Sequence, residues 1–287
     1  MDSKTIRGTF GDLSPVLTRE VRVLVITGYG LNCEAETATA FALLGVRVDQ
    51  VHLADLLERG RRALDGYHMV AFIGGFSFGD HVASGRVLAN RLRGRLGDAL
   101  AAFVDCGGLG LGMCNGFQVM VKLGLLPALE RARGRPLAAQ TVSLVHNDRF
   151  GYYDAWVRLR IDPASPCVFT RGIAFLELPC RHAEGKLVFD PSVVEEVAKA
   201  HLVPLQYVGT EGKPTQIWPD NPNGSGGAAA GLCDRSGRVF GLMPHPEAYL
   251  YPENHPRWIE QRDEARLPAV GQGLHLFANG VRAVLAS

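Results

Sequence analysis

Two segments far apart in the chain carry residue types that could do covalent chemistry together. Cys114 lies in Gly-Met-Cys-Asn-Gly-Phe-Gln (112–118), where a short apolar run meets an expected helix, and Pro-His-Pro-Glu (244–247) follows much later. A thiol at a strand-to-helix turn projects away from the backbone, and the amides and dipole of the following helix favour its thiolate form. The sequence therefore predicts that Cys114 is a nucleophile.

The second segment supplies a base and a group to orient it. A residue before a proline is steered into extended backbone, so the side chains of His245 and Glu247 should project to the same side. A Cys-His-Glu set then divides the work as a Ser-His-Asp triad does, into nucleophile, proton carrier and orienting carboxylate. A buried structural thiol is the commoner fate of a cysteine, but Gly112 and Gly116 frame Cys114 as a crowded turn requires.

A glycine-rich loop, Gly-Gly-Phe-Ser-Phe-Gly-Asp (74–80), follows another apolar run. It lacks the Lys-Ser/Thr that completes a P-loop, so we predict no nucleotide binding there. Bare glycine backbone would let the amide of Gly75 approach a tetrahedral oxyanion, joined by the amide of Asn115 after the nucleophile. The alternative is a plain glycine-rich turn.

Alternating apolar runs and helical patterns position these segments. Residues 21–28, 46–53 and 68–73 have the composition of buried strands, and the first two are followed by helical patterns, the second over 54–64. Leucines recurring every fourth residue mark one face of a long helix before Cys114. We therefore predict an α/β fold with a mostly parallel open sheet flanked by helices, whose loops at the carboxyl ends of the strands share one crevice.

The second half of the chain predicts antiparallel additions to this sheet. Residues 156–161 alternate apolar and charged side chains, as a strand with one wet face does. Residues 228–233 and 238–243 flank a turn sequence, so a hairpin should deliver His245 to the crevice. A last helix is expected over 274–285.

One domain over residues 21–287 accounts for these patterns. Residues 1–20 are expected to be a peripheral N-terminal extension, and the proline-rich stretch 249–270 is long enough for a lid or a docking loop.

Composition narrows the class of protein. The 287 residues carry a formal net charge of +1, which does not suit a general nucleic-acid binder. No stretch has the length and apolar character of a signal peptide core or a membrane span, so we expect a soluble cytoplasmic protein whose six cysteines are reduced. The histidines and cysteines show no metal-ligand spacing, and we predict no metal site.

Together the motifs resemble the class I (triad) glutamine amidotransferases. The match narrows to the glutaminase subunits of phosphoribosylformylglycinamidine synthase, an enzyme of purine biosynthesis, and runs from about Val21 to Glu247. The segments that carry it are 74–80, 114–118, 123–127, 182–185, 221–225 and 241–247.

The resemblance implies the same triad as the residue types do, with Cys114 as nucleophile, His245 as general acid and base, and Glu247 as its partner. It also implies backbone donors to the oxyanion from Gly75 and Asn115. The residues implied for the glutamine pocket are Gln118, Phe76, Asn147 and Tyr152. Two positions depart from the family, which has a serine where Arg149 stands and a glycine where Ala183 stands.

The activity implied by the resemblance is hydrolysis of L-glutamine through a cysteinyl thioester, which releases ammonia. The chain has no ATP motif, so no cofactor is expected on it, and the resemblance places ATP and magnesium on a synthetase partner. That partner would convert formylglycinamide ribonucleotide to formylglycinamidine ribonucleotide, in a complex that includes a small third subunit.

Three other functions fit parts of the pattern. A class I amidotransferase serving another acceptor would have the same triad. A cysteine hydrolase or stress protein of the DJ-1 type commonly has histidine directly after the nucleophile, where this chain has Asn115. A binding subunit that kept the fold without catalysis is the third.

Overall fold

Six strands form the central sheet in a computed structural model that describes residues 3–129 and 137–287. Their order is β10-β11-β4-β3-β1-β2, and only β10 runs antiparallel to its neighbour. The strands are β1 (Arg22–Thr27), β2 (Arg47–His52), β3 (Met69–Phe72), β4 (Leu109–Met113), β10 (Gly231–Cys233) and β11 (Val239–Leu242). β3 and β4 are buried along their whole length, as apolar strands inside a parallel sheet are. The predicted α/β fold is confirmed.

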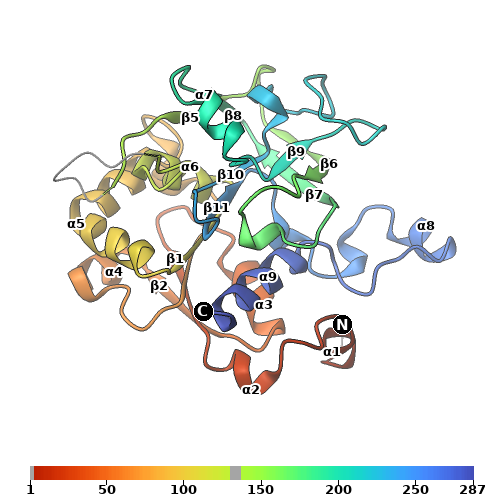
Figure 1. The fold of residues 1–287 in the computed structure, drawn as a ribbon, viewed down its shortest axis with the longest axis horizontal. Helices are drawn as coiled ribbons and strands as arrows, with labels where there is room; N and C mark the ends of the chain where they lie inside the picture. Colours follow the sequence, from red (N-terminus) through yellow and green to blue (C-terminus); the bar gives the residue numbers. More distant parts are fainter. Residues whose placement is uncertain (1–2, 130–136) are drawn as a thin grey trace.

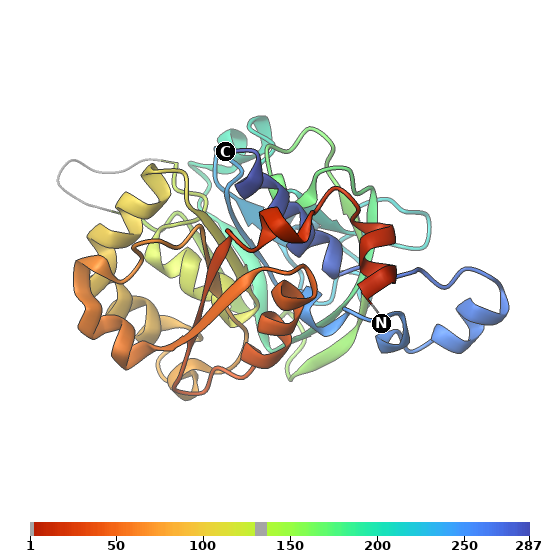
Figure 2. The same cartoon turned by 90° about the horizontal axis from the view of Figure 1, so that it is seen from below.

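Helices cover both faces of this sheet (Figures 1 and 2). α4 (Leu53–Arg59), α5 (Arg86–Asp105) and α6 (Asn115–Leu123) pack together on one side, and α3 (Glu34–Leu43) packs against α9 (Leu274–Leu285). The predicted leucine face of α5 is buried, and each such side chain stabilises the fold by about 1.5–3 kcal/mol relative to exposure. The helix predicted over 54–64 ends earlier, because Gly60 adopts a positive φ of 57° and a 3-10 turn follows.

The second half of the chain adds two small antiparallel sheets, as predicted. One pairs β5 (Val142–His146) with β8 (Glu184–Phe189), and the other has the order β7 (Phe175–His182), β6 (Tyr153–Ile161), β9 (Leu205–Tyr207). Backbone hydrogen bonds tie this part to the central sheet, among them Ala230 N–H to Leu205 O at 2.9 Å. The hairpin of β10 and β11 is confirmed, with residues 234–237 as its turn.

The N-terminal segment packs on the last helix. It contains α1 (Ser3–Thr9) and α2 (Pro15–Thr18), and between them Phe10 is only 2% exposed. Both oxygens of the Asp12 carboxylate accept from the Arg282 guanidinium on α9, from Nε at 2.5 Å and from Nη2 at 2.7 Å. The segment expected to be peripheral therefore contacts the core directly.

Residues 249–270 extend from the body of the molecule (Figures 1 and 2). The segment contains η6 (Pro252–Asn254) and α8 (Trp258–Asp263). It is anchored at its base, where His255 is buried and its Nε2 lies 3.1 Å from a Glu177 carboxylate oxygen.

The remaining elements are short. They are α7 (Val194–Lys199), η1 (Gly60–Arg62), η2 (Ser77–Asp80), η3 (Val168–Thr170), η4 (Gly226–Ala228) and η5 (Pro246–Ala248). Within the described ranges, no helix combines the length and the hydropathy that crossing a bilayer requires.

Candidate active site

Cys114 occupies a strained turn between β4 and α6. Its φ of 48° and ψ of −107° lie outside the regions that residues with a side chain usually adopt. The turn is crowded, because a β-carbon on Gly116 would lie 1.8 Å from the Phe72 carbonyl oxygen, and one on Gly112 would lie 2.3 Å from the Met120 sulfur. Glycines flank the thiol as predicted, and they allow the tight turn that places Cys114 at the carboxyl end of β4.

Pairing between strands brings the second segment to this thiol. Cys114 N–H donates to Leu242 O at 2.8 Å, at the end of β11 and three residues before His245. His245 N–H in turn donates to Pro179 O on β7 at 2.8 Å. Cys114 Sγ lies 3.6 Å from the Arg181 carbonyl oxygen on the same strand. β7 therefore contacts both Cys114 and His245, the predicted nucleophile and base.

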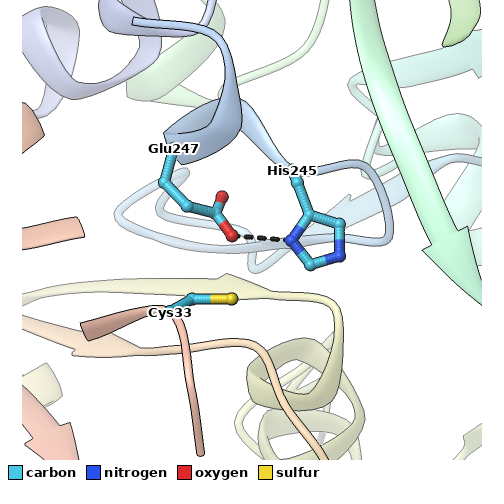
Figure 3. A group of neighbouring side chains, drawn as sticks. All are labelled: Cys33, His245 and Glu247. Carbon is cyan, nitrogen blue, oxygen red and sulfur yellow. Dashed lines mark hydrogen bonds and ion pairs between the residues drawn. The ribbon is translucent and has the colours of Figure 1, made fainter. Parts of the chain in front are cut away.

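His245 and Glu247 face one another as the proline spacing predicted (Figure 3). Nδ1 of the imidazole lies 2.6 Å from Glu247 Oε1, and the glutamate is only 2% exposed. Burial lowers the pKa of His245, but the charges of Glu247 and Cys114 and contact with the two nearby thiols raise the pKa well above its ordinary value. Nε2 has no hydrogen-bond partner among the described residues, so it is free to exchange a proton with a neighbour.

Of the two backbone amides predicted as oxyanion donors, Gly75 lies in the wall of the pocket that Cys114 lines, and Asn115 directly follows Cys114. In the described part of the chain, the N–H groups of Gly75 and Asn115 have no acceptor. Gly75 has a φ of 137°, and a β-carbon there would lie 2.6 Å from Gly30 O, so only glycine fits this approach of the two loops. The Asn115 side chain supports the loop, since its Oδ1 accepts from Ser77 N–H at 3.4 Å.

A pocket with a volume of about 240 Å³ opens over the thiol and the imidazole. Phe76 and Tyr152, both predicted for the substrate site, line it with their rings 6.2 Å apart. Gln118 also lines it, and its amide is held at both ends, by Glu184 O at 2.6 Å and by Asn115 Nδ2 at 2.9 Å.

Asn147 does not line the pocket. Its side chain is buried behind the wall, where Nδ2 donates to His182 O at 3.0 Å and Oδ1 accepts from Gly185 N–H at 3.0 Å. The geometry gives Asn147 the role of fixing the turn between β7 and β8, rather than the substrate contact predicted from the sequence.

The pocket wall also contains acidic groups that sequence reasoning did not single out. Glu184 and Glu36 line it together with Asp80, whose pKa burial raises above its ordinary value. Ser84 Oγ donates to Asp80 Oδ2 at 2.9 Å, and Ser84 N–H donates to Glu184 Oε2 at 3.3 Å. Carboxylates so placed suit the ammonium group of an amino acid.

Cys33 is the second thiol in the pocket wall, and sequence reasoning missed it. It occupies the N-cap position of α3, and burial raises the pKa of its thiol. The signal was available, because Cys33 follows β1 as Cys114 follows β4, and parallel strands bring their following loops to the same edge.

The chain is similar to known proteins over most of its length. Residues 20–284 match the model of the CobB/CobQ-like glutamine amidotransferase domain. The phosphoribosylformylglycinamidine synthase subunit PurQ of Dehalococcoides mccartyi is 39% identical, over 92% of this chain and 97% of that protein. Human phosphoribosylformylglycinamidine synthase is 35% identical over 80% of this chain, which corresponds to 18% of that protein. A chain in the structure of PurLQS from Thermotoga maritima superposes with a TM-score of 0.65 at 26% identity, covering 91% of this chain and 98% of that one.

Proposed function

The chain belongs to the family of the CobB/CobQ-like glutamine amidotransferase domain, and we propose that it is the glutaminase subunit of a phosphoribosylformylglycinamidine synthase. It hydrolyses L-glutamine through a thioester on Cys114 and supplies the ammonia to a synthetase subunit. The observation that carries the proposal is the arrangement around Cys114, which lies at a strained strand-to-helix turn. His245 lines the same pocket, and its Nδ1 lies 2.6 Å from Glu247 Oε1. Two backbone amides nearby, those of Gly75 and Asn115, have no acceptor among the described residues.

The first half-reaction forms the thioester. The Cys114 thiolate attacks the side-chain carbonyl carbon of glutamine, and the oxygen gains the negative charge. N–H groups of Gly75 and Asn115 stabilise this oxyanion, which in mutational studies of other enzymes is worth about 3–4 kcal/mol per donor. His245, protonated because Glu247 raises its pKa, then gives its proton to the departing nitrogen.

The second half-reaction returns the enzyme to its starting state. Neutral His245 accepts a proton from water as the water attacks the thioester carbonyl, and the Cys114 sulfur leaves. Glu247 keeps Nδ1 occupied throughout, so that Nε2 is the nitrogen that exchanges protons. The products are glutamate and ammonia.

The pocket suits glutamine as the substrate. Phe76 and Tyr152 supply apolar walls, Gln118 closes the end beside the nucleophile, and Glu184 and Asp80 offer carboxylates to the α-ammonium group. Glutamine carries its ammonium and carboxylate together at one end of a short apolar chain and a neutral carboxamide at the other, and the carboxylates and aromatic rings of this wall suit that arrangement.

The ammonia requires a partner to be useful. In neutral water ammonia becomes ammonium, which is unreactive as a nucleophile, so a synthetase must receive it through a shielded path. The human relative supports such coupling, because the region similar to this chain is 18% of a longer protein named for the whole synthase. The synthetase would bind ATP and magnesium, and a small third subunit would complete the complex.

Glutamine-dependent amidation tests the proposal. The chain is mixed with the synthetase and its small subunit, and formylglycinamide ribonucleotide is converted with either glutamine or ammonium as nitrogen source. We expect both sources to work with the wild type, and only ammonium to work with Cys114→Ala. Conversion with ammonium but not with glutamine in the wild type would overturn the proposal, and glutamine-dependent amidation of a different acceptor would assign the chain to another pathway.

A further inference from the structure

A thiol that the proposed reaction does not use lies against the catalytic pair. Cys33, His245 and Glu247 each offer one donor atom, and these three atoms all lie within 4.8 Å of one another. Figure 3 shows the Cys33 sulfur beside the imidazole and carboxylate, which reach it from a different segment of the chain. Cys33 comes from the start of α3, and the other two come from the loop after β11.

One oxygen in this group of side chains has a free lone pair. Glu247 Oε2 has no hydrogen-bond partner in the described ranges, although the residue is only 2% exposed. A β-carbon on Gly74 would lie 3.0 Å from Cys33 Sγ and 3.0 Å from His245 Cε1. Any larger residue at this position would press on both the thiol and the ring, so glycine allows the two groups to lie this close.

We propose that Cys33, His245 and Glu247 bind one Zn²⁺ ion, and that this ion inhibits the enzyme. Thiolate, imidazole and carboxylate are the donors that zinc takes in proteins, with bonds of about 2.0–2.3 Å, and three protein ligands leave a fourth position for water from the pocket. Tetrahedral bonds of that length need only small side-chain movements from the present separations. Magnesium does not fit, because it prefers a shell of oxygen ligands and only one carboxylate is present.

The charges balance without any oxidation. Zn²⁺ binding displaces the thiol proton of Cys33 and the proton that His245 and Glu247 share, and both protons pass to solvent. The thiolate and the carboxylate then neutralise the two charges of the ion, which suits a buried site. An imidazole nitrogen committed to the ion leaves His245 unable to cycle its proton, so glutamine hydrolysis stops. Inhibition rests on the proposed function, whereas binding of the ion does not.

Titration calorimetry of the full chain with Zn²⁺ tests the site directly. We expect one ion per chain, at least about a tenfold loss of affinity in Cys33→Ser, and recovery in Cys33→Asp, which restores a donor. The exposed thiol variant Cys106→Ser is the matched control and should bind like the wild type. The proposal is overturned if Cys33→Ser binds zinc with the affinity of the wild type. It is also overturned if Cys114→Ser loses as much zinc affinity as Cys33→Ser or more, because the ion would then bind to the nucleophile.

Glutamate release measures the consequence. Micromolar Zn²⁺ should inhibit the wild type, a chelator should restore activity, and Cys33→Ser should need about tenfold more zinc for the same inhibition. Millimolar Mg²⁺ should have no effect. A wild type that releases no glutamate even without zinc defeats the proposed function, while the titration still decides the ion site. Zinc inhibition that is identical in Cys33→Ser defeats the ion site alone.

Discussion

At the scale of single residues, the charge on His245 determines how the site works. Glu247 lies 2.6 Å from Nδ1 and is the largest cause that raises the pKa of this imidazole. Because the pKa is raised, the imidazolium persists to higher pH than a free histidine would allow. Proton donation to the leaving nitrogen therefore remains possible at neutral pH.

Glu247→Gln tests that dependence. Without the carboxylate the pKa of His245 falls, so the imidazolium is lost at lower pH, and the alkaline limb of the pH profile for kcat/KM should move to lower pH. We expect kcat to drop by about 10²–10⁴-fold, in line with the loss of the orienting carboxylate in serine proteases. The profile is measured by glutamate release across pH, with Glu247→Asp as the variant that keeps the charge. An unchanged alkaline limb in Glu247→Gln would contradict this role for the carboxylate.

At the scale of elements, β7 connects the two catalytic segments. Its Pro179 carbonyl accepts from the backbone of His245, and its Arg181 carbonyl faces the Cys114 sulfur. Behind the strand, His182 Nδ1 lies 3.1 Å from Asn147 Oδ1 and Nε2 lies 3.0 Å from Cys180 Sγ. This buried network, with Asn147 at its centre, fixes the strand that positions the triad.

Stability in acid should report on this network. Burial lowers the pKa of His182 to about 3, so the folded protein keeps this ring neutral while the unfolded chain protonates it below about pH 6.5. The unfolded state then binds more protons, and stability falls as pH drops through that window. We expect about 2 kcal/mol to be lost from this group between pH 6.5 and 5, seen in urea unfolding. His182→Asn keeps a donor toward Asn147, and its free energy of unfolding should fall by about 2 kcal/mol less than that of the wild type over the same pH range. Equal falls in the two proteins would show that His182 is not the group responsible.

The crowded turn at Cys114 makes a second prediction at this scale. Gly116→Ala puts a β-carbon against Phe72 O, and we expect about 3 kcal/mol of destabilisation in urea unfolding. Gly94→Ala is the matched control, because this exposed glycine inside α5 has no neighbour within 4 Å and the change should stabilise by up to about 1 kcal/mol. Similar stability in the two variants would mean that the turn is not as crowded as its geometry indicates.

The elements that sequence patterns located best are those whose signal is local. α9 has the predicted bounds, and the hairpin that carries His245 was visible from its turn residues. Cys33 and Asn147 show where local patterns fail. Cys33 enters the pocket only because β1 and β4 lie on either side of β3 in the sheet, and Asn147 is turned inward by the packing of β5 against β8. The sequence shows that Cys33 follows a strand, but it does not show the strand order that brings Cys33 beside Cys114, and it gives no signal for the inward turn of Asn147.

At the scale of the whole molecule, residues 249–270 are the candidate docking segment. None of the residues that line the described pocket belongs to it, and α8 stands away from the body (Figure 1). Ile259 on this helix is 52% exposed. These observations favour docking over a lid that closes on the site.

Coupling to the synthetase should depend on this segment. Ile259→Glu should lower glutamine-dependent amidation by at least about tenfold, since an unpaired charge in a protein interface costs several kcal/mol, while ammonium-dependent amidation stays at the wild-type level. Ile217→Glu, an equally drastic change at another exposed isoleucine, is the control. Equal glutamine-dependent amidation in the two variants would show that residues 249–270 do not contact the synthetase.

Chemical labelling can identify the sulfur that attacks glutamine. The full chain is treated with the glutamine analogue 6-diazo-5-oxo-L-norleucine, which alkylates an attacking thiolate, and the labelled peptide is identified by mass spectrometry. We predict one label per chain on Cys114, protection by glutamine, and at least about a hundredfold slower labelling in His245→Ala. A label on Cys33, or labelling of Cys114 at the same rate without the imidazole, would contradict the role of Cys114 as a nucleophile activated by His245.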